Sequence, residues 1–224
     1  MSSTKLSPST LNLYLECPRC FWLDKIKNIK RPRGIFPSLP GGMDRVIKTY
    51  FDAYRVKKVL PPELQGNDFN GVQLFDNQSQ IDRWRNWQTG LQYREDDGSI
   101  LIGALDDLLV KGREYIPFDY KTKGSPASEE GAVRYYQFQL DCYALLLEAN
   151  GLPTLGHGFL LFYSPKVVGE YGHVVFEHQV IKIATDIERA RKIFRSAVTL
   201  LKGLEPEVNI ECEYCKWFGK LKGR

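Results

Sequence analysis

The stretch Ile100–Lys123, which reads ILIGALDDLLVKGREYIPFDYKTK, carries charged residues inside two apolar runs. We expect two β-strands, Ile100–Val110 and Glu114–Thr122, joined by the turn Lys111-Gly112-Arg113. The charged residues within the strands are Asp106, Asp107, Asp119 and Lys121. Such groups are costly to bury without a partner or a metal. The chain must therefore fold so that these acids meet cations.

Side chains alternate across a strand, so Asp119 and Lys121 share one face, about 6–7 Å apart along the backbone. Phe118 and Tyr120 face the other way. If the two strands pair, Asp106 approaches Asp119 from the neighbouring strand. The pattern then predicts two carboxylates and one ammonium group around a small space.

Carboxylate oxygens in this arrangement suit Mg²⁺ or Mn²⁺. The chemistry that such a metal does best is orienting a phosphate and activating a water molecule. The alternative is that the acids face solvent, as most acids in strands do. Catalysis is favoured because Asp106 lies in a Gly-x-x-Asp run directly upstream of the Asp-x-Lys strand. Gly103 fits a place where backbone or ligand approaches closely. The pattern therefore favours metal-dependent phosphodiester hydrolysis.

The length of 224 residues allows one substantial core, so we expect a single domain over residues 1–224. No apolar run approaches the roughly 20 residues of a membrane helix. The N-terminal residues lack the apolar core of a secretory signal, which predicts a cytoplasmic protein with reduced thiols. The formal charge of +4 is compatible with a nucleic-acid partner.

Helical periodicity and capping residues predict helices over Pro8–Glu16, Gly42–Val59, Ser128–Asn150 and Thr185–Leu201, with a brief helix after Asp76. Further strands are expected at Gln88–Glu95, Phe159–Tyr163 and Gly172–Ile183. This order predicts a mixed β-sheet flanked by helices, an α/β or α+β fold. The segment Lys25–Pro40 is predicted to be a basic loop, either a solvated connector or a contact for a phosphate backbone.

Two C-x-x-C pairs stand at opposite ends of the chain, in residues 1–24 and 204–224: Cys17 with Cys20, and Cys212 with Cys215. In a reduced compartment, two such pairs predict one tetrahedral four-thiolate site. Either Zn²⁺ or an iron–sulfur cluster accepts four thiolates, so the spacing does not choose between them. The site would join the termini and have a mainly structural role.

Four stretches, in this order, resemble the PD-(D/E)XK nuclease superfamily, specifically its RecB-like exonuclease branch, which includes CRISPR-associated exonucleases. They are LSPSTLNLYLECPRCFWL (Leu6–Leu23), IGALDDLLV with Asp106, IPFDYKTKG with Asp119 and Lys121, and QFQLDCYALLLE with Gln139 and Tyr143. The resemblance implies a restriction-endonuclease-like α/β fold, with a mixed β-sheet core between helices and the four-cysteine site joining the termini.

The resemblance also implies roles for individual residues. Asp106 and Asp119 would bind the divalent ion, helped by the backbone carbonyl of Tyr120. Lys121 would orient or deprotonate the attacking water. The remaining pair, Gln139 and Tyr143, would contact the DNA strand or support the site.

The chain departs from the family pattern at two places. Relatives often bind a [4Fe-4S] cluster through one N-terminal and three C-terminal cysteines, whereas this chain has two at each end; Zn²⁺ is the alternative occupant. Relatives also commonly place a metal-binding histidine on the helix after the basic loop, and GGMDRVIKTYFDAY has none. We expect Asp44 to replace it as an oxygen ligand, or Asp52 to lie nearby from the same helix.

Together these features predict a Mg²⁺- or Mn²⁺-dependent DNA nuclease, an exonuclease acting on single-stranded or processed ends. DNA rather than RNA follows from the resemblance alone. One alternative is a catalytically inactive nucleic-acid-binding or assembly subunit that keeps the fold. Another is a cytosolic protein whose termini are joined by zinc and whose function is unrelated to nucleic acid.

Overall fold

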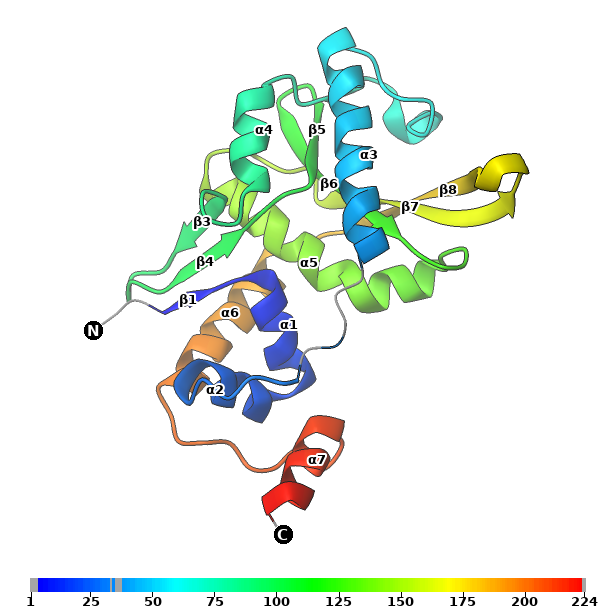
Figure 1. Ribbon diagram of the computed structural model, residues 1–224. Helices are drawn as coiled ribbons and strands as arrows, with labels where there is room; N and C mark the ends of the chain where they lie inside the picture. The colour runs from blue at the N-terminus through cyan, green and yellow to red at the C-terminus, as the bar shows by residue number, and fades with distance from the viewer. Residues whose placement is uncertain (1–3, 33, 35–37, 223–224) are drawn as a thin grey trace.

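Two β-sheets lie between layers of helices in the computed structural model, which describes residues 4–32, 34 and 38–222 (Figure 1). The helices are α1 (Pro8–Glu16), α2 (Pro18–Ile26), α3 (Ser38–Lys57), α4 (Gln78–Arg85), α5 (Glu129–Ala149), α6 (Ile187–Leu201) and α7 (Glu213–Lys222), with short 3₁₀ turns η1 (Asn67–Phe69) and η2 (Glu170–Gly172). The strands are β1 (Lys5–Leu6), β2 (Val72–Leu74), β3 (Leu91–Arg94), β4 (Ile100–Gly103), β5 (Asp107–Lys111), β6 (Glu114–Thr122), β7 (His157–Val168) and β8 (Val174–Ala184).

The larger sheet has the strand order β2-β5-β6-β7-β8, and the smaller one the order β1-β4-β3. In the larger sheet, only β6 and β7 are parallel, with Asp119 opposite Leu160. A parallel pair needs a long crossover, and the helix α5 supplies it. The mixed sheets with flanking helices confirm the predicted α/β class.

The alternation along β6 divides the protein into two cores. Phe118 and Tyr120 pack against Phe51 of α3 on one face of the sheet. On the other face, Asp119 and Lys121 point toward α5. The polar residues of β6 are therefore on the side of the crossover helix, as the strand period predicts.

The predicted single strand Ile100–Val110 is wrong: it is two strands, β4 and β5, in different sheets. The chain leaves the β4 ladder at Ala104, and the Leu105 amide donates to the carbonyl of Trp84 at 3.1 Å. Of these two strands, β5 pairs with β6 and β4 does not. The turn between β5 and β6 is Gly112-Arg113, since Lys111 pairs with Glu114. Gly112 has φ +62°, a conformation that favours glycine.

Two helices near the ends of the chain were not predicted. The first, α2, begins at Pro18, where Cys17 accepts a hydrogen bond from the Cys20 amide at 3.4 Å. The second, α7, carries the C-terminal cysteine pair. Because α2 ends at Ile26 and α3 begins at Ser38, the predicted basic loop is shorter than expected. Its residues 33 and 35–37 lie outside the described residues.

The other predicted elements are present with shifts of a few residues at their ends, and α1 has the predicted bounds. Ser7 caps α1 by accepting a hydrogen bond from the Thr10 amide at 3.3 Å. Within the described ranges, none of the helices has both the length and the apolar character that crossing a membrane requires.

A buried ion network holds α3 and α4 to the sheet. The Asp107 side chain is fully buried and accepts hydrogen bonds from Arg55 of α3 at 2.6 and 2.7 Å. Arg85 of α4 donates to the same carboxylate at 3.2 Å, and the Tyr120 hydroxyl also donates to it. Arg85 further donates to the backbone carbonyl of Asp106 at 2.8 Å. The network thus fixes the backbone where Asp106 precedes β5.

Replacing Arg55 by methionine should lower the free energy of unfolding by about 3 kcal/mol, because it leaves the Asp107 charge buried and less compensated. Urea denaturation followed by circular dichroism measures the change. The control is Lys182→Met, which removes an exposed 2.8 Å pair with Asp68 and should change the value by less than about 1 kcal/mol. Equal losses in the two variants would contradict the role of the buried network.

Candidate active site and four-cysteine centre

The predicted acids and lysine meet where β5 begins beside β6. Asp107 pairs with Phe118, so Asp106 stands next to Asp119 on the adjoining strand. The Asp119 side chain is 1% exposed, and the Lys121 ammonium is in contact with its Oδ2 atom. The Asp106 side chain is 22% exposed and gives the cluster its opening to solvent. The structure therefore brings Asp106, Asp119 and Lys121 together.

The two carboxylates affect each other's ionisation. Burial and the neighbouring Asp106 charge raise the pKa of Asp119. Burial works to raise the pKa of Asp106 as well, but the Lys48 ammonium at 2.8 Å, the contact with Asp119 and the Lys121 charge together outweigh it, and the pKa is lowered. The negative charge of the pair therefore needs compensation, which a proton on Asp119, the neighbouring lysines or a divalent cation can supply.

The crossover helix α5 supplies the next contacts. Gln139 donates from Nε2 to Asp119 Oδ1 at 3.0 Å and to the Tyr143 hydroxyl at 2.7 Å. The predicted i,i+4 pair thus lies against the acidic cluster. Burial, followed by the charges of Asp119 and Asp106, raises the pKa of Tyr143 well above its usual value.

The helix α3 contributes a residue that we did not predict for the site. Lys48 lies between Asp106 and Asp44, with its Nζ atom 2.9 Å from Asp44 Oδ2. Asp44 therefore reaches Asp106 through the Lys48 ammonium that lies between them. Asp52 pairs instead with Arg85 at 2.8 Å. In the sequence, the one sign that Lys48 could belong to the site was its position four residues after Asp44. The same spacing is equally typical of a solvated helix face.

One buried atom at the site suits a divalent cation. Asp119 Oδ2 is buried and accepts no well-directed hydrogen bond, although the Lys121 ammonium touches it. A second carboxylate, that of Asp106, adjoins it from the next strand. Hard cations such as Mg²⁺ bind through one or two carboxylates and keep several waters. The residues present therefore fit such an ion.

The four paired cysteines form a second centre, as predicted. Their sulfur atoms all lie within 4.8 Å of one another and are buried. The individual separations are 3.7 Å for Cys17–Cys215, 3.7 Å for Cys20–Cys212 and 3.8 Å for Cys20–Cys215. These distances are too long for disulfides. The centre joins α2 to α7 and so ties the two ends of the chain.

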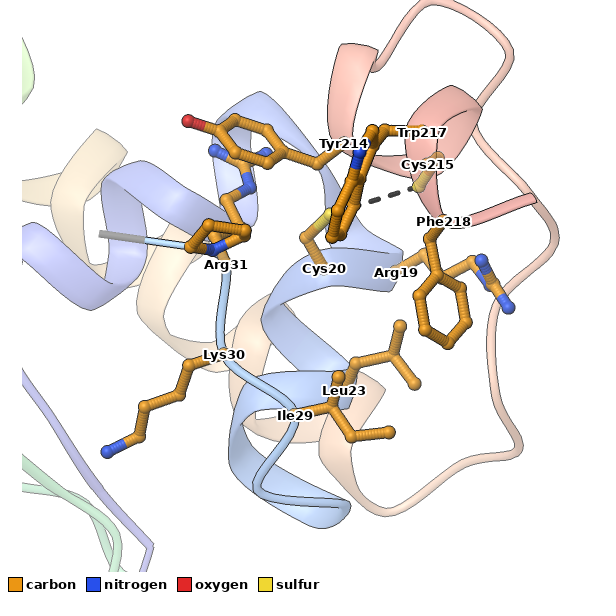
Figure 2. A pocket seen from close by; sticks show the side chains of 11 residues that line it. Arg19, Cys20, Leu23, Ile29, Lys30, Arg31, Tyr214, Cys215, Trp217 and Phe218 are labelled. Carbon is orange, nitrogen blue, oxygen red and sulfur yellow. Dashed lines mark hydrogen bonds between the residues drawn. The ribbon is translucent and has the colours of Figure 1, made fainter. Parts of the chain in front are cut away.

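The surroundings of the cysteines combine burial, which disfavours thiolates, with a positive charge, which stabilises them. Burial raises the pKa of Cys20 to about 12, and a coordinated cation reverses this preference because it deprotonates the thiol. Arg31 donates to Cys212 Sγ at 3.6 Å, and its guanidinium lies 4.4 Å from the centre of the Tyr214 ring. Figure 2 shows Tyr214 and Trp217 of α7 beside Cys20, with Arg31 next to the tyrosine. The Arg31 guanidinium next to the sulfurs thus partly offsets the negative charge of a tetrathiolate site.

The sulfur separations test which group the cysteines fit. A tetrahedral zinc ion with Zn–S bonds of about 2.3 Å requires sulfurs about 3.8 Å apart, close to the three separations above. A four-iron cluster places its iron cube between the cysteines and needs a wider spacing. The donor set is thus compatible with a single ion.

Comparison with known proteins agrees with this geometry. The family model for the PD-(D/E)XK nuclease superfamily matches residues 55–218. This range contains Asp106, Asp119, Lys121, Gln139 and Tyr143, and it begins after Lys48. A search of curated proteins finds no match. Members of the superfamily are generally metal-dependent nucleases. The chain belongs to the PD-(D/E)XK nuclease superfamily.

Proposed function

We propose that the protein is a Mg²⁺- or Mn²⁺-dependent DNA exonuclease of the RecB-like branch, acting on single-stranded or processed ends. The observation that carries the proposal is the burial of Asp119 against Asp106 with the Lys121 ammonium beside both. The assignment to the RecB-like branch, which includes CRISPR-associated exonucleases, is supported by the Leu6–Leu23 stretch and the four cysteines. We also propose a single domain over residues 1–224 and a cytoplasmic location.

In this proposal, Asp106 and Asp119 hold the divalent ion together with the backbone carbonyl of Tyr120. The ion, when bound, polarises the scissile phosphate and activates a water. Lys121 orients the attacking water and offsets charge next to the phosphate. Gln139 keeps the Asp119 carboxylate in place through its 3.0 Å hydrogen bond, and Tyr143 holds the Gln139 amide.

Asp119→Asn should abolish Mn²⁺-dependent cleavage of single-stranded DNA, because the amide keeps the shape but loses the charge that binds the ion. Lys121→Ala should lower the rate by about 10²–10⁴-fold, the usual range for a group that handles the proton or charge of the reaction. A gel assay with end-labelled DNA, with and without Mn²⁺, measures both.

The control is Asp68→Asn, the same substitution at an exposed carboxylate of η1, which should leave the rate unchanged. Full activity of Asp119→Asn would contradict the proposal. A wild-type protein that binds DNA in a salt-sensitive manner but does not cleave it would support the inactive-subunit alternative.

For the four-cysteine centre we propose a single structural Zn²⁺ ion in place of the [4Fe-4S] cluster that the resemblance favours. Support comes from the separations of 3.7 to 3.8 Å between three pairs of sulfurs. All four ligands belong to the protein, so the ion has no open position for catalysis. Its role is to tie α7 to α2.

Elemental analysis should find one zinc per chain in a colourless protein. Cys212→Ser should lose the zinc and lower the melting temperature by roughly 10 °C or more, since loss of a metal site is among the changes that cost about 4 kcal/mol or more, and each kcal/mol is worth about 2–4 °C in a chain of this size. Iron with sulfide, and broad visible absorbance, would contradict the assignment.

A further inference from the structure

A hollow of about 460 Å³ with both polar and apolar walls is linked to the acidic cluster through Gln139, which lines the hollow and donates a hydrogen bond to Asp119. It lies where α1, the end of β4 and α5 meet (Figure 1). Its walls include Asn12 of α1, Trp87 from the loop after α4, and Gln139 and Tyr143 of α5. We infer that this hollow is a subsite for one unpaired nucleobase of the substrate, stacked on Trp87. The inference rests on the proposed function, because it assumes a nucleic-acid substrate.

Trp87 lacks the burial expected of a core aromatic residue. Its side chain is 71% exposed, whereas Trp84 in the same segment is 7% exposed and stacks on Phe75 with ring centres 5.4 Å apart. Packing within the described chain therefore explains Trp84 and leaves Trp87 unexplained. An exposed indole at the edge of a hollow suits an unpaired base, since proteins stack single-stranded bases on aromatic side chains.

The opposite wall links the hollow to the reaction. Gln139 lines it and donates to Asp119 Oδ1 at 3.0 Å. A base in the hollow would therefore lie one side chain away from the carboxylate that is proposed to hold the ion. Asn12 offers both a donor and an acceptor on its amide, so it can meet the edge of a base.

This arrangement favours an unpaired base. In a duplex, each base is stacked on both sides and its Watson–Crick edge is occupied, so entry into the hollow costs a few kcal/mol of unstacking and unpairing. A single strand or a frayed end does not have to break base pairs. The subsite thus gives a physical reason for a preference for single-stranded ends.

The test is the affinity of Trp87→Ala for a short fluorescein-labelled oligothymidylate, measured by anisotropy without added divalent cations so that no cleavage occurs. We expect a loss of about 5- to 150-fold, the range that one stacked base provides. Trp87→Phe, which keeps a ring, should retain most of the affinity. Binding of a blunt duplex should be unchanged by Trp87→Ala.

The matched control is Trp217→Ala, which removes another exposed indole, at the four-cysteine centre, and should leave the oligothymidylate affinity unchanged. Wild-type affinity in Trp87→Ala, an equal loss with duplex, or no binding of oligothymidylate by the wild type would overturn the inference. The binding measurement does not depend on cleavage, so the two proposals fail separately. If the wild-type protein binds the single strand through Trp87 but does not cleave it, the exonuclease assignment is wrong and the subsite stands.

Discussion

The burial of Asp119 beside a second carboxylate is the interaction on which the site depends. Two like charges in a poorly solvated place are costly unless cations compensate them. Lys121 and Lys48 supply part of this compensation from β6 and α3, and each contacts a different acid of the pair. A divalent ion bound by the two carboxylates would compensate them more fully than the lysines do, and the Asp119 Oδ2 atom, which accepts no well-directed hydrogen bond, could serve as a ligand. The same charge balance would favour a phosphate once the ion is in place.

The rest of the fold holds this pair in position by two means. On the sheet, the Asp107 network ties α3, α4 and β6 to the start of β5, and Arg85 also holds the Asp106 carbonyl. At the termini, the cysteines tie α7 to α2, next to α1, whose first turn lines the hollow by the acids. The four-cysteine centre is therefore connected to the candidate active site through the consecutive helices α2 and α1.

The parts that could be predicted from the sequence are those governed by local periodicity. The strand period places Asp119 and Lys121 on one face and Phe118 on the other, and the Gln-x-x-x-Tyr spacing puts Gln139 and Tyr143 on one helix face. The two C-x-x-C pairs predict their cluster because four thiolates share one preferred geometry.

Long-range partners could not be predicted in this way. The break between β4 and β5 involves the hydrogen bond from the Leu105 amide to the Trp84 carbonyl of α4, which no local pattern shows. Lys48 looked like one half of an i,i+4 pair, and its contact with Asp106 follows only from how α3 packs on the sheet. The exposure of Trp87 likewise depends on the loop after α4.

Anomalous diffraction from crystals soaked in Mn²⁺ tests the central claim most directly. We expect a manganese peak between the carboxylates of Asp106 and Asp119 and the Tyr120 carbonyl, with Lys121 nearby. No peak at these carboxylates, with manganese bound elsewhere on the protein, would contradict it.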